Sequence, residues 1–208
     1  MTTSDPYPRV RKEIISAAES DDAGFLEESG VRAFWGEPGF TPIERRWTRP
    51  TVDFNGIWGG FQGQGAKTVT PCEAHAKITC RLVPGQTPDR VMDLLKRHIE
   101  RHTPDYAEIT VEPLKGSAHP YSLDLDSDSL AVAASALEAV FGVAPSYVRS
   151  GGTVPITDVF RQELGLDTVT IGFGLPGSRA HAPNEWFDPS CLPDARNAYA
   201  TYLSMLGG

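Results

Sequence analysis

Residues 74–104 read AHAKITCRLVPGQTPDRVMDLLKRHIERHTP, a strand pattern followed directly by a helix pattern. In the first part, small and apolar side chains alternate with polar ones, the period of two expected when a sheet buries one face. Thr87 and Pro88 then supply a cap and a first-turn proline, and apolar residues recur at helical spacing as far as Thr103. The stretch therefore predicts a strand with its even-numbered face packed inward, and an amphipathic helix after it.

The alternation of strands and helices continues along the chain and predicts an α/β or α+β class. Ser127 is expected to cap a helix that Gly142 ends, and Gly165 to end the next one. A group of Pro, Gly and Ser residues between 113 and 128 indicates a domain boundary. The other expected helices span about 10–18, 21–30, 155–164 and 189–206, and the other expected strands 52–58, 107–111 and 168–173, the last of a type buried on both faces.

The composition excludes several classes of protein. The 208 residues include 27 Asp or Glu and 19 Lys or Arg, a formal net charge of -8. No basic cluster could neutralise a run of phosphates, so we expect no nucleic-acid partner. No apolar run approaches the roughly 20 residues that span a bilayer, and the start has neither a basic nor an apolar signal segment. We therefore expect a cytoplasmic protein with no membrane partner, whose three cysteines are reduced, structural thiols.

A glycine-rich run at 59–65, GGFQGQG, with Lys67 and Thr68 after it, is similar in outline to a phosphate-binding loop. That loop requires Lys directly after the last glycine and a helix opening there, whereas Ala66 intervenes here and residues 68–71 continue as a strand. A flexible or bulged hairpin is the better interpretation of the run.

The histidines offer two candidate ligand positions. His98 and His102 are four apart on the expected helix, but Arg101 lies between them and the Glu of a zincin motif is displaced, so a solvated helix face is predicted. His181 lies in the loop after the last expected strand, where chemistry gathers in α/β folds, and the Ala-Pro that follows is expected to keep it extended. From position alone, it is either a functional ligand or an ordinary loop histidine.

A turn at Gly151-Gly152-Thr153, with Arg149 just before it, is a candidate anion pocket. Two glycines leave backbone N–H groups accessible, and the threonine adds a hydroxyl. The signal is weak when taken alone.

Four blocks, taken in their order, resemble one enzyme family. They are KTVTP at 67–71, AKI at 76–78 with RLVPGQTP at 81–88, GGTVPI at 151–156 and AHAPNE at 180–185. Together they look like the zinc amidohydrolases of peptidase family M20, which include carnosinase-like dipeptidases, aminoacylases and succinyl-diaminopimelate desuccinylase. The resemblance runs from about Pro50 to the C-terminus and is strongest to the dipeptidase branch.

The resemblance implies α/β with α+β architecture: a two-layer α+β dimerisation lid followed by the C-terminal fragment of a zinc-peptidase α/β catalytic domain. Residues 1–122 would form the lid and 123–208 the catalytic fragment, which agrees with the boundary indicated by composition. The resemblance further implies a homodimer through the lid, two zinc ions in a complete site, and a peptide or N-acyl amino acid substrate.

It also implies roles for individual residues. His181 matches the family's last metal ligand. Arg81 and His119 match lid residues that bind the substrate carboxylate and polarise the scissile carbonyl, and Thr68 matches one that reaches the partner's site. The turn that closes on the substrate's terminal carboxylate is matched by Gly151, Gly152 and Thr153.

The remaining metal ligands and the general base of the family precede the lid and have no counterpart here. Glu27 and Glu28 form the only Glu-Glu pair, outside the family's context. A hydrolytic site needs about three protein ligands per metal. The first hypothesis is therefore the C-terminal half of a metallo-dipeptidase that is inactive alone. It would be either a truncated product or one piece of a split enzyme whose N-terminal half is a separate chain. The alternative is a non-catalytic dimerisation or regulatory module.

Overall fold

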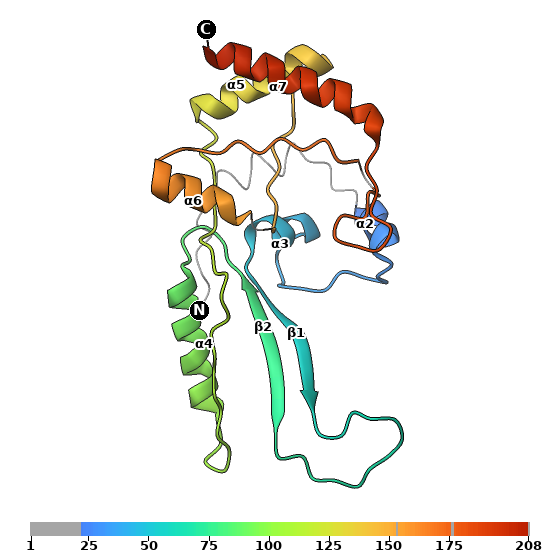
Figure 1. The fold of residues 1–208 in the computed structure, drawn as a ribbon, viewed down its shortest axis with the longest axis vertical. Coiled ribbons are helices and arrows are strands. Elements are labelled where there is room, and N and C mark those ends of the chain that lie inside the picture. Colours follow the sequence, from blue (N-terminus) through green and yellow to red (C-terminus); the bar gives the residue numbers. More distant parts are fainter. Residues whose placement is uncertain (1–21, 153, 176, 208) are drawn as a thin grey trace.

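The computed structural model describes residues 22–152, 154–175 and 177–207, so the helix expected at 10–18 lies outside the described residues. The helices α5 and α7 lie together at one end of the molecule, α3 and α6 lie in the middle, and a hairpin and α4 extend toward the other end (Figure 1). In chain order the elements are α2 (Asp22–Ser29), α3 (Pro42–Thr48), β1 (Thr51–Gly59), β2 (Ala74–Arg81), α4 (Pro88–His102), α5 (Asp128–Phe141), α6 (Pro155–Leu164), the 3-10 helix η1 (Pro189–Cys191) and α7 (Leu192–Gly207).

Strands β1 and β2 form an antiparallel hairpin with a bulge next to Gly56. The inward-packed face predicted for β2 is confirmed only in the second half of the strand. Ile78 and Cys80 are half-buried there, whereas Ala74 and Ala76 in the first half are exposed. The outer half of the hairpin projects away from the rest of the molecule, so neither face is covered there (Figure 1).

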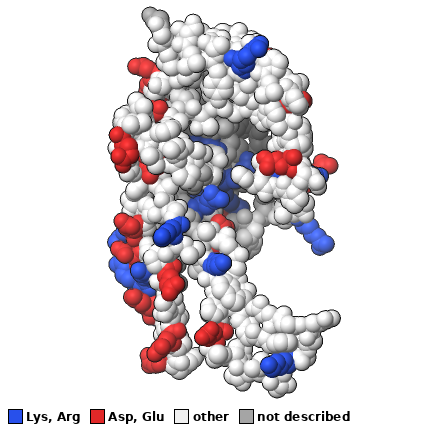
Figure 2. All heavy atoms as spheres, viewed as in Figure 1, with Lys and Arg blue, Asp and Glu red and all other residues white. Residues whose placement is uncertain are grey.

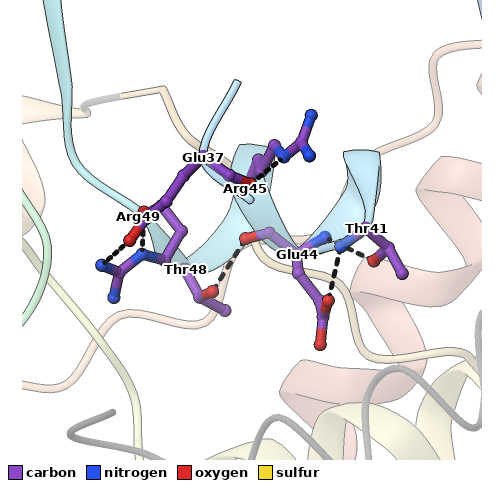
Figure 3. A network of polar contacts seen from close by, with 6 residues as sticks. All are labelled: Glu37, Thr41, Glu44, Arg45, Thr48 and Arg49. Carbon is purple, nitrogen blue, oxygen red and sulfur yellow. Dashed lines mark hydrogen bonds and ion pairs between the residues drawn. The ribbon is translucent and has the colours of Figure 1, made fainter. Parts of the chain in front are cut away.

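Helix α3 is held by its own cap and by the loop before it (Figure 3). The hydroxyl of Thr41 accepts from the N–H of Glu44 at 3.3 Å, and the Glu44 carboxylate accepts from the N–H of Thr41 at 2.6 Å, a reciprocal capping box. Arg49 donates two hydrogen bonds to the Glu37 carboxylate, at 2.7 and 2.8 Å. These bonds lower the pKa of Glu37 and fix the chain just before it enters the hairpin.

Helices α5 and α7 pack against each other through small side chains. Ala133, Ala136 and Ala198 are each 1% exposed. The ring of Phe173 lies 6.4 Å from that of Phe141 and 5.9 Å from that of Tyr199, measured between centroids. The segment that carries Phe173 therefore lies against this helix pair.

Three segments expected as strands, 68–71, 107–111 and 168–173, are not strands in the described structure, whose sheet consists of β1 and β2. The prediction was wrong because a strand exists only where a neighbour completes its hydrogen bonds. The apolar pattern of 168–173 is real, but Val169, Ile171 and Phe173 are half-buried rather than buried on two faces.

The predicted helix caps and helix-ending glycines are confirmed, with one correction. The hydroxyl of Thr87 accepts from the N–H of Arg90 at 3.4 Å, as expected of a cap. Gly142 and Gly165 end their helices in the left-handed region, at φ 73° and 66°. Ser127 precedes α5 as predicted, yet its side chain makes no capping hydrogen bond.

All three cysteines are free thiols, as predicted. Burial raises the pKa of Cys80, and the nearby Asp53 adds to the shift. Cys72 is exposed, which corrects the expectation that every cysteine is structural. Within the described ranges, no helix has both the length and the apolar character needed to cross a membrane.

Candidate functional site

His119 lies in the segment between α4 and α5 and contacts helix α6. Its backbone N–H donates to Oδ2 of Asp158 at 3.1 Å, and its ring Nδ1 lies 3.2 Å from the same oxygen. One helical turn further along α6, Nε2 of Gln162 lies 3.0 Å from Nδ1 of His119 and 2.8 Å from Oδ1 of Asp158. The His119 side chain is 48% exposed and that of Asp158 18% exposed, so the cluster is open to solvent on the histidine side.

The Asp158 carboxylate carries the charge of this cluster. Desolvation works to raise its pKa, but hydrogen bonds from the His119 backbone, Gln162 and the His119 ring together lower it below the ordinary value. Asp158 is therefore an ionised acceptor at neutral pH, placed in the first turn of α6, where the helix dipole favours negative charge.

The residues just after His119 are also tied to the C-terminal part of the chain. The Tyr121 hydroxyl donates to the carbonyl oxygen of Thr168 at 3.0 Å and accepts from the Thr168 N–H at 2.6 Å. Arg161 donates to the carbonyl oxygen of Ser122 at 3.2 Å and pairs with Asp167 at 2.5 Å. Its guanidinium lies 4.5 Å from the centre of the Tyr121 ring. Segment 119–122 is thus held by hydrogen bonds to α6 and to the residues that follow this helix.

The glycine turn packs against α3. A Cβ at Gly151 would lie 2.6 Å from the carbonyl oxygen of Arg46, so only glycine allows the two backbones to approach this closely. The N–H of Gly152 donates to the hydroxyl of Ser150 at 3.0 Å, so this donor already has a partner within the turn. Thr153, the third residue of the predicted pocket, lies outside the described residues.

His181 is presented by a loop that Trp186 closes. The indole N–H of Trp186 donates to the carbonyl oxygen of Gly177 at 2.8 Å, and its backbone N–H donates to that of Ser178 at 3.0 Å. His181 is exposed and has φ 63°, which corrects the expectation of an extended backbone: the Ala-Pro pair restricts residue 182, not 181. Two further non-glycine residues of the loop also have positive φ, Arg179 and Asn184. Three such residues in one short loop store backbone strain, which is typical of functional loops.

The other predicted residues lie apart from these clusters. Arg81 is exposed at the end of β2, and Thr68 is exposed in the connection between β1 and β2, at the end of the molecule opposite α5 and α7 (Figure 1). Within the described part of the chain, no hydrogen bond, ion pair or ring contact joins Arg81, Thr68 or His181 to the His119 cluster.

His98 and His102 are exposed on α4, as predicted, with their ring centroids 4.3 Å apart. The described residues contain no group of three or more His, Cys, Asp or Glu side chains that could hold a metal ion. Because a hydrolytic zinc takes about three protein ligands, the residues described here do not fit a zinc site by themselves.

Charge is distributed unevenly on the visible face. Figure 2 shows Lys and Arg side chains in a hollow at the level of α3, with Asp and Glu side chains beside it, and side chains of both charges along the edge formed by α4. Helix α3 and its C-cap include Arg45, Arg46 and Arg49.

Asp158, Gln162 and Trp186 were missed by sequence reasoning. Asp158 and Gln162 lie four residues apart on the polar side of a helix whose bounds were predicted, so their proximity to each other could have been found. Their contact with His119, across 39 and 43 residues, has no signal in local periodicity.

Comparison with known proteins places these features in context. Residues 12–107 match the family model of a peptidase dimerisation domain. The Cys-Gly metallodipeptidase DUG1 of Candida albicans is 33% identical over 171 residues, which are 79% of this chain and 34% of the relative. The human Beta-Ala-His dipeptidase is 30% identical over 141 residues, 67% of this chain and 28% of the relative.

A solved structure agrees with the fold. The M20 family metallo-carboxypeptidase Sso-CP2 from Sulfolobus solfataricus superposes with a TM-score of 0.81 at 28% identity, over 95% of this chain and 45% of that one. The chain spans about a third of the length of the curated dipeptidases it matches.

Proposed function

Because this chain belongs to the M20 metallopeptidase family, we propose that it supplies the dimerisation lid and the C-terminal part of the catalytic domain to a dipeptidase-like hydrolase. Such an enzyme would cleave peptide or N-acyl amide bonds in a metal-dependent reaction. The observation that carries the proposal is the superposition of 95% of the chain on an M20 metallo-carboxypeptidase.

The proposed enzyme needs metal ligands beyond those in the described residues. The described residues lack a group of three metal donors, and the match covers only 34% of the Candida albicans relative. We infer that the remaining zinc ligands and the general base come from an N-terminal half of the catalytic domain, which the residues described here do not include. This chain alone is then inactive.

Within that enzyme, the residues of this chain bind and orient the substrate. The fork of N–H donors on Arg81 suits a carboxylate, and His119 would form a hydrogen bond with the scissile carbonyl oxygen. The backbone of Gly151 and Gly152 and the hydroxyl of Thr153 would close on the terminal carboxylate. Thr68 would reach the partner's site, and His181 would contribute an imidazole to the metal.

Assembly into a homodimer through the lid is part of the proposal. The match to a peptidase dimerisation domain supports it. So does the exposed apolar surface of β1, where Val52, Phe54 and Ile57 are 58%, 62% and 75% exposed.

Elemental analysis and a peptidase assay test the proposal together. After dialysis against zinc, the purified chain should hold well below two zinc ions and should not turn over Cys-Gly. Adding the N-terminal half of an M20 dipeptidase should restore both zinc and turnover, and His181→Ala should abolish the restored turnover, with His98→Ala as the matched control. If the chain alone turns over Cys-Gly and His181→Ala abolishes that turnover, the proposal that this chain is inactive by itself is refuted.

The alternative, a non-catalytic dimerisation module, is favoured by the same lack of a donor group. It predicts a stable dimer, measured by analytical ultracentrifugation, whose unfolding temperature is the same with and without zinc. It also predicts that no added N-terminal half restores turnover.

A further inference from the structure

We propose that Asp158 is the positioning residue of His119: it holds the imidazole in the tautomer with its proton on Nδ1, which leaves Nε2 as the available nitrogen. The tautomer follows from the contacts of this chain alone. Its meaning for hydrolysis rests on the proposed function.

Asp158 contacts both the backbone and the ring of His119. One carboxylate oxygen, Oδ2 of Asp158, lies 3.1 Å from the backbone nitrogen of His119 and 3.2 Å from its ring Nδ1. Because both contacts converge on one oxygen, they fix the ring relative to its own backbone. The carboxylate sits on a helix and is mostly shielded, so it is a firm support.

Gln162 and Asp158 both lie within hydrogen-bond distance of Nδ1 of His119, and the neutral ring can bond only one of them through this atom. The side-chain Nε2 of Gln162 lies 3.0 Å from Nδ1 of His119, and an amide can donate to Nδ1 only if Nδ1 carries no proton. In that arrangement the Nδ1 lone pair and the Asp158 oxygen would face each other at 3.2 Å with no proton between them. If Nδ1 carries the proton instead, it donates to Asp158, and Gln162 keeps its bond to Oδ1 at 2.8 Å.

The carboxylate decides between the two arrangements. A hydrogen bond to an ionised acceptor is roughly twice as strong as one between neutral groups. The Nδ1–H arrangement makes that stronger bond and removes the repulsion, at the loss of one neutral bond. Asp158 therefore determines the tautomer.

This tautomer changes the role open to His119. With the proton on Nδ1, a neutral ring presents a lone pair at Nε2, which accepts a hydrogen bond or a proton, as in other carboxylate–histidine pairs. It donates from Nε2 only when the ring is protonated. His119 therefore supplies the hydrogen bond to a carbonyl oxygen that the proposed function assigns to it only in the protonated form of the ring.

Long-range proton–nitrogen NMR on the uniformly ¹⁵N-labelled chain tests the proposal. Spectra are recorded above the pH at which the histidines titrate, and the His119 signals are assigned by their loss in His119→Gln. We expect Nδ1 of His119 to show the shift of a protonated ring nitrogen and Nε2 that of an unprotonated one. A majority of the opposite tautomer in the wild-type chain would overturn the proposal.

Two variants separate Asp158 from its neighbour. Asp158→Ala should shift the population toward the Nε2–H tautomer, and Gln162→Leu, the matched control on the same helix, should leave it unchanged. If Asp158→Ala does not fold, Asp158→Asn keeps the shape without the charge and should show the same direction of change. An unchanged tautomer in a folded Asp158 variant would refute the proposal. Because the measurement uses neither substrate nor metal, its failure is distinct from failure of the dipeptidase assay.

Discussion

Replacing Gly151 with alanine should destabilise the protein by forcing α3 away from the glycine turn. The added Cβ would lie 2.6 Å from the carbonyl oxygen of Arg46, about 0.8 Å inside ordinary van der Waals contact. That oxygen belongs to a helical backbone, so it cannot rotate aside as the end of a side chain could. Overpacking of this kind costs about 1–3 kcal/mol, and a cost of about 2 kcal/mol would lower the unfolding temperature by roughly 4–8 °C in a chain of this size.

Thermal unfolding followed by circular dichroism measures this effect, and Gly172→Ala is the matched control. Gly172 also has an exposed backbone, but a Cβ there would meet nothing within 4 Å. The control should therefore unfold close to the wild-type temperature. If Gly151→Ala is no more destabilising than Gly172→Ala, the close packing of the turn on α3 is not a feature of the protein in solution.

Three further substitutions test the hydrogen bonds of Tyr121, the carboxylate of Asp158 and the loop closed by Trp186. Tyr121→Phe removes both hydrogen bonds to the Thr168 backbone and should cost about 1–2 kcal/mol, with faster hydrogen exchange of the Thr168 amide as the direct readout. The folded state lowers the pKa of Asp158, so its contribution to stability is present above the ordinary pKa and is lost as pH falls through the folded value. Denaturant unfolding at several pH values should show that Asp158→Asn weakens this dependence, and an identical profile would contradict it. Trp186→Phe keeps the ring but loses the indole bond to the Gly177 carbonyl, so amides from 178 to 186 should exchange faster while those of α5 do not change.

Helix ends were predictable because their signals are local. A cap such as Thr87 acts on an N–H three residues away, and Gly142 and Gly165 act through their own backbone angle. The β1–β2 hairpin likewise followed from alternation and a glycine-rich turn. Ser127 shows the limit of such signals: the residue type fits a cap, but the hydroxyl is not used.

The strands predicted at 107–111 and 168–173 were wrong, because strand formation depends on pairing with a neighbouring strand and not on the segment itself. The candidate site shows the same division. The position of His181 after an apolar segment was visible in the sequence, whereas its left-handed backbone and its closure by Trp186 were not. The contact of His119 with Asp158 depends on how α6 docks, which no local pattern encodes.

The chain enters the unit formed by the hairpin and α4 just after Arg49 and leaves it just before His119, and both points are anchored (Figure 1). The entry is fixed by the ion pair with Glu37, and the exit by the bond to Asp158. Because both connections are held by polar contacts, we expect the hairpin and α4 to move relative to α6 mainly about the line between the two connections. Loss of the Arg49–Glu37 pair or of the His119–Asp158 contact should therefore increase the mobility of the hairpin relative to α6.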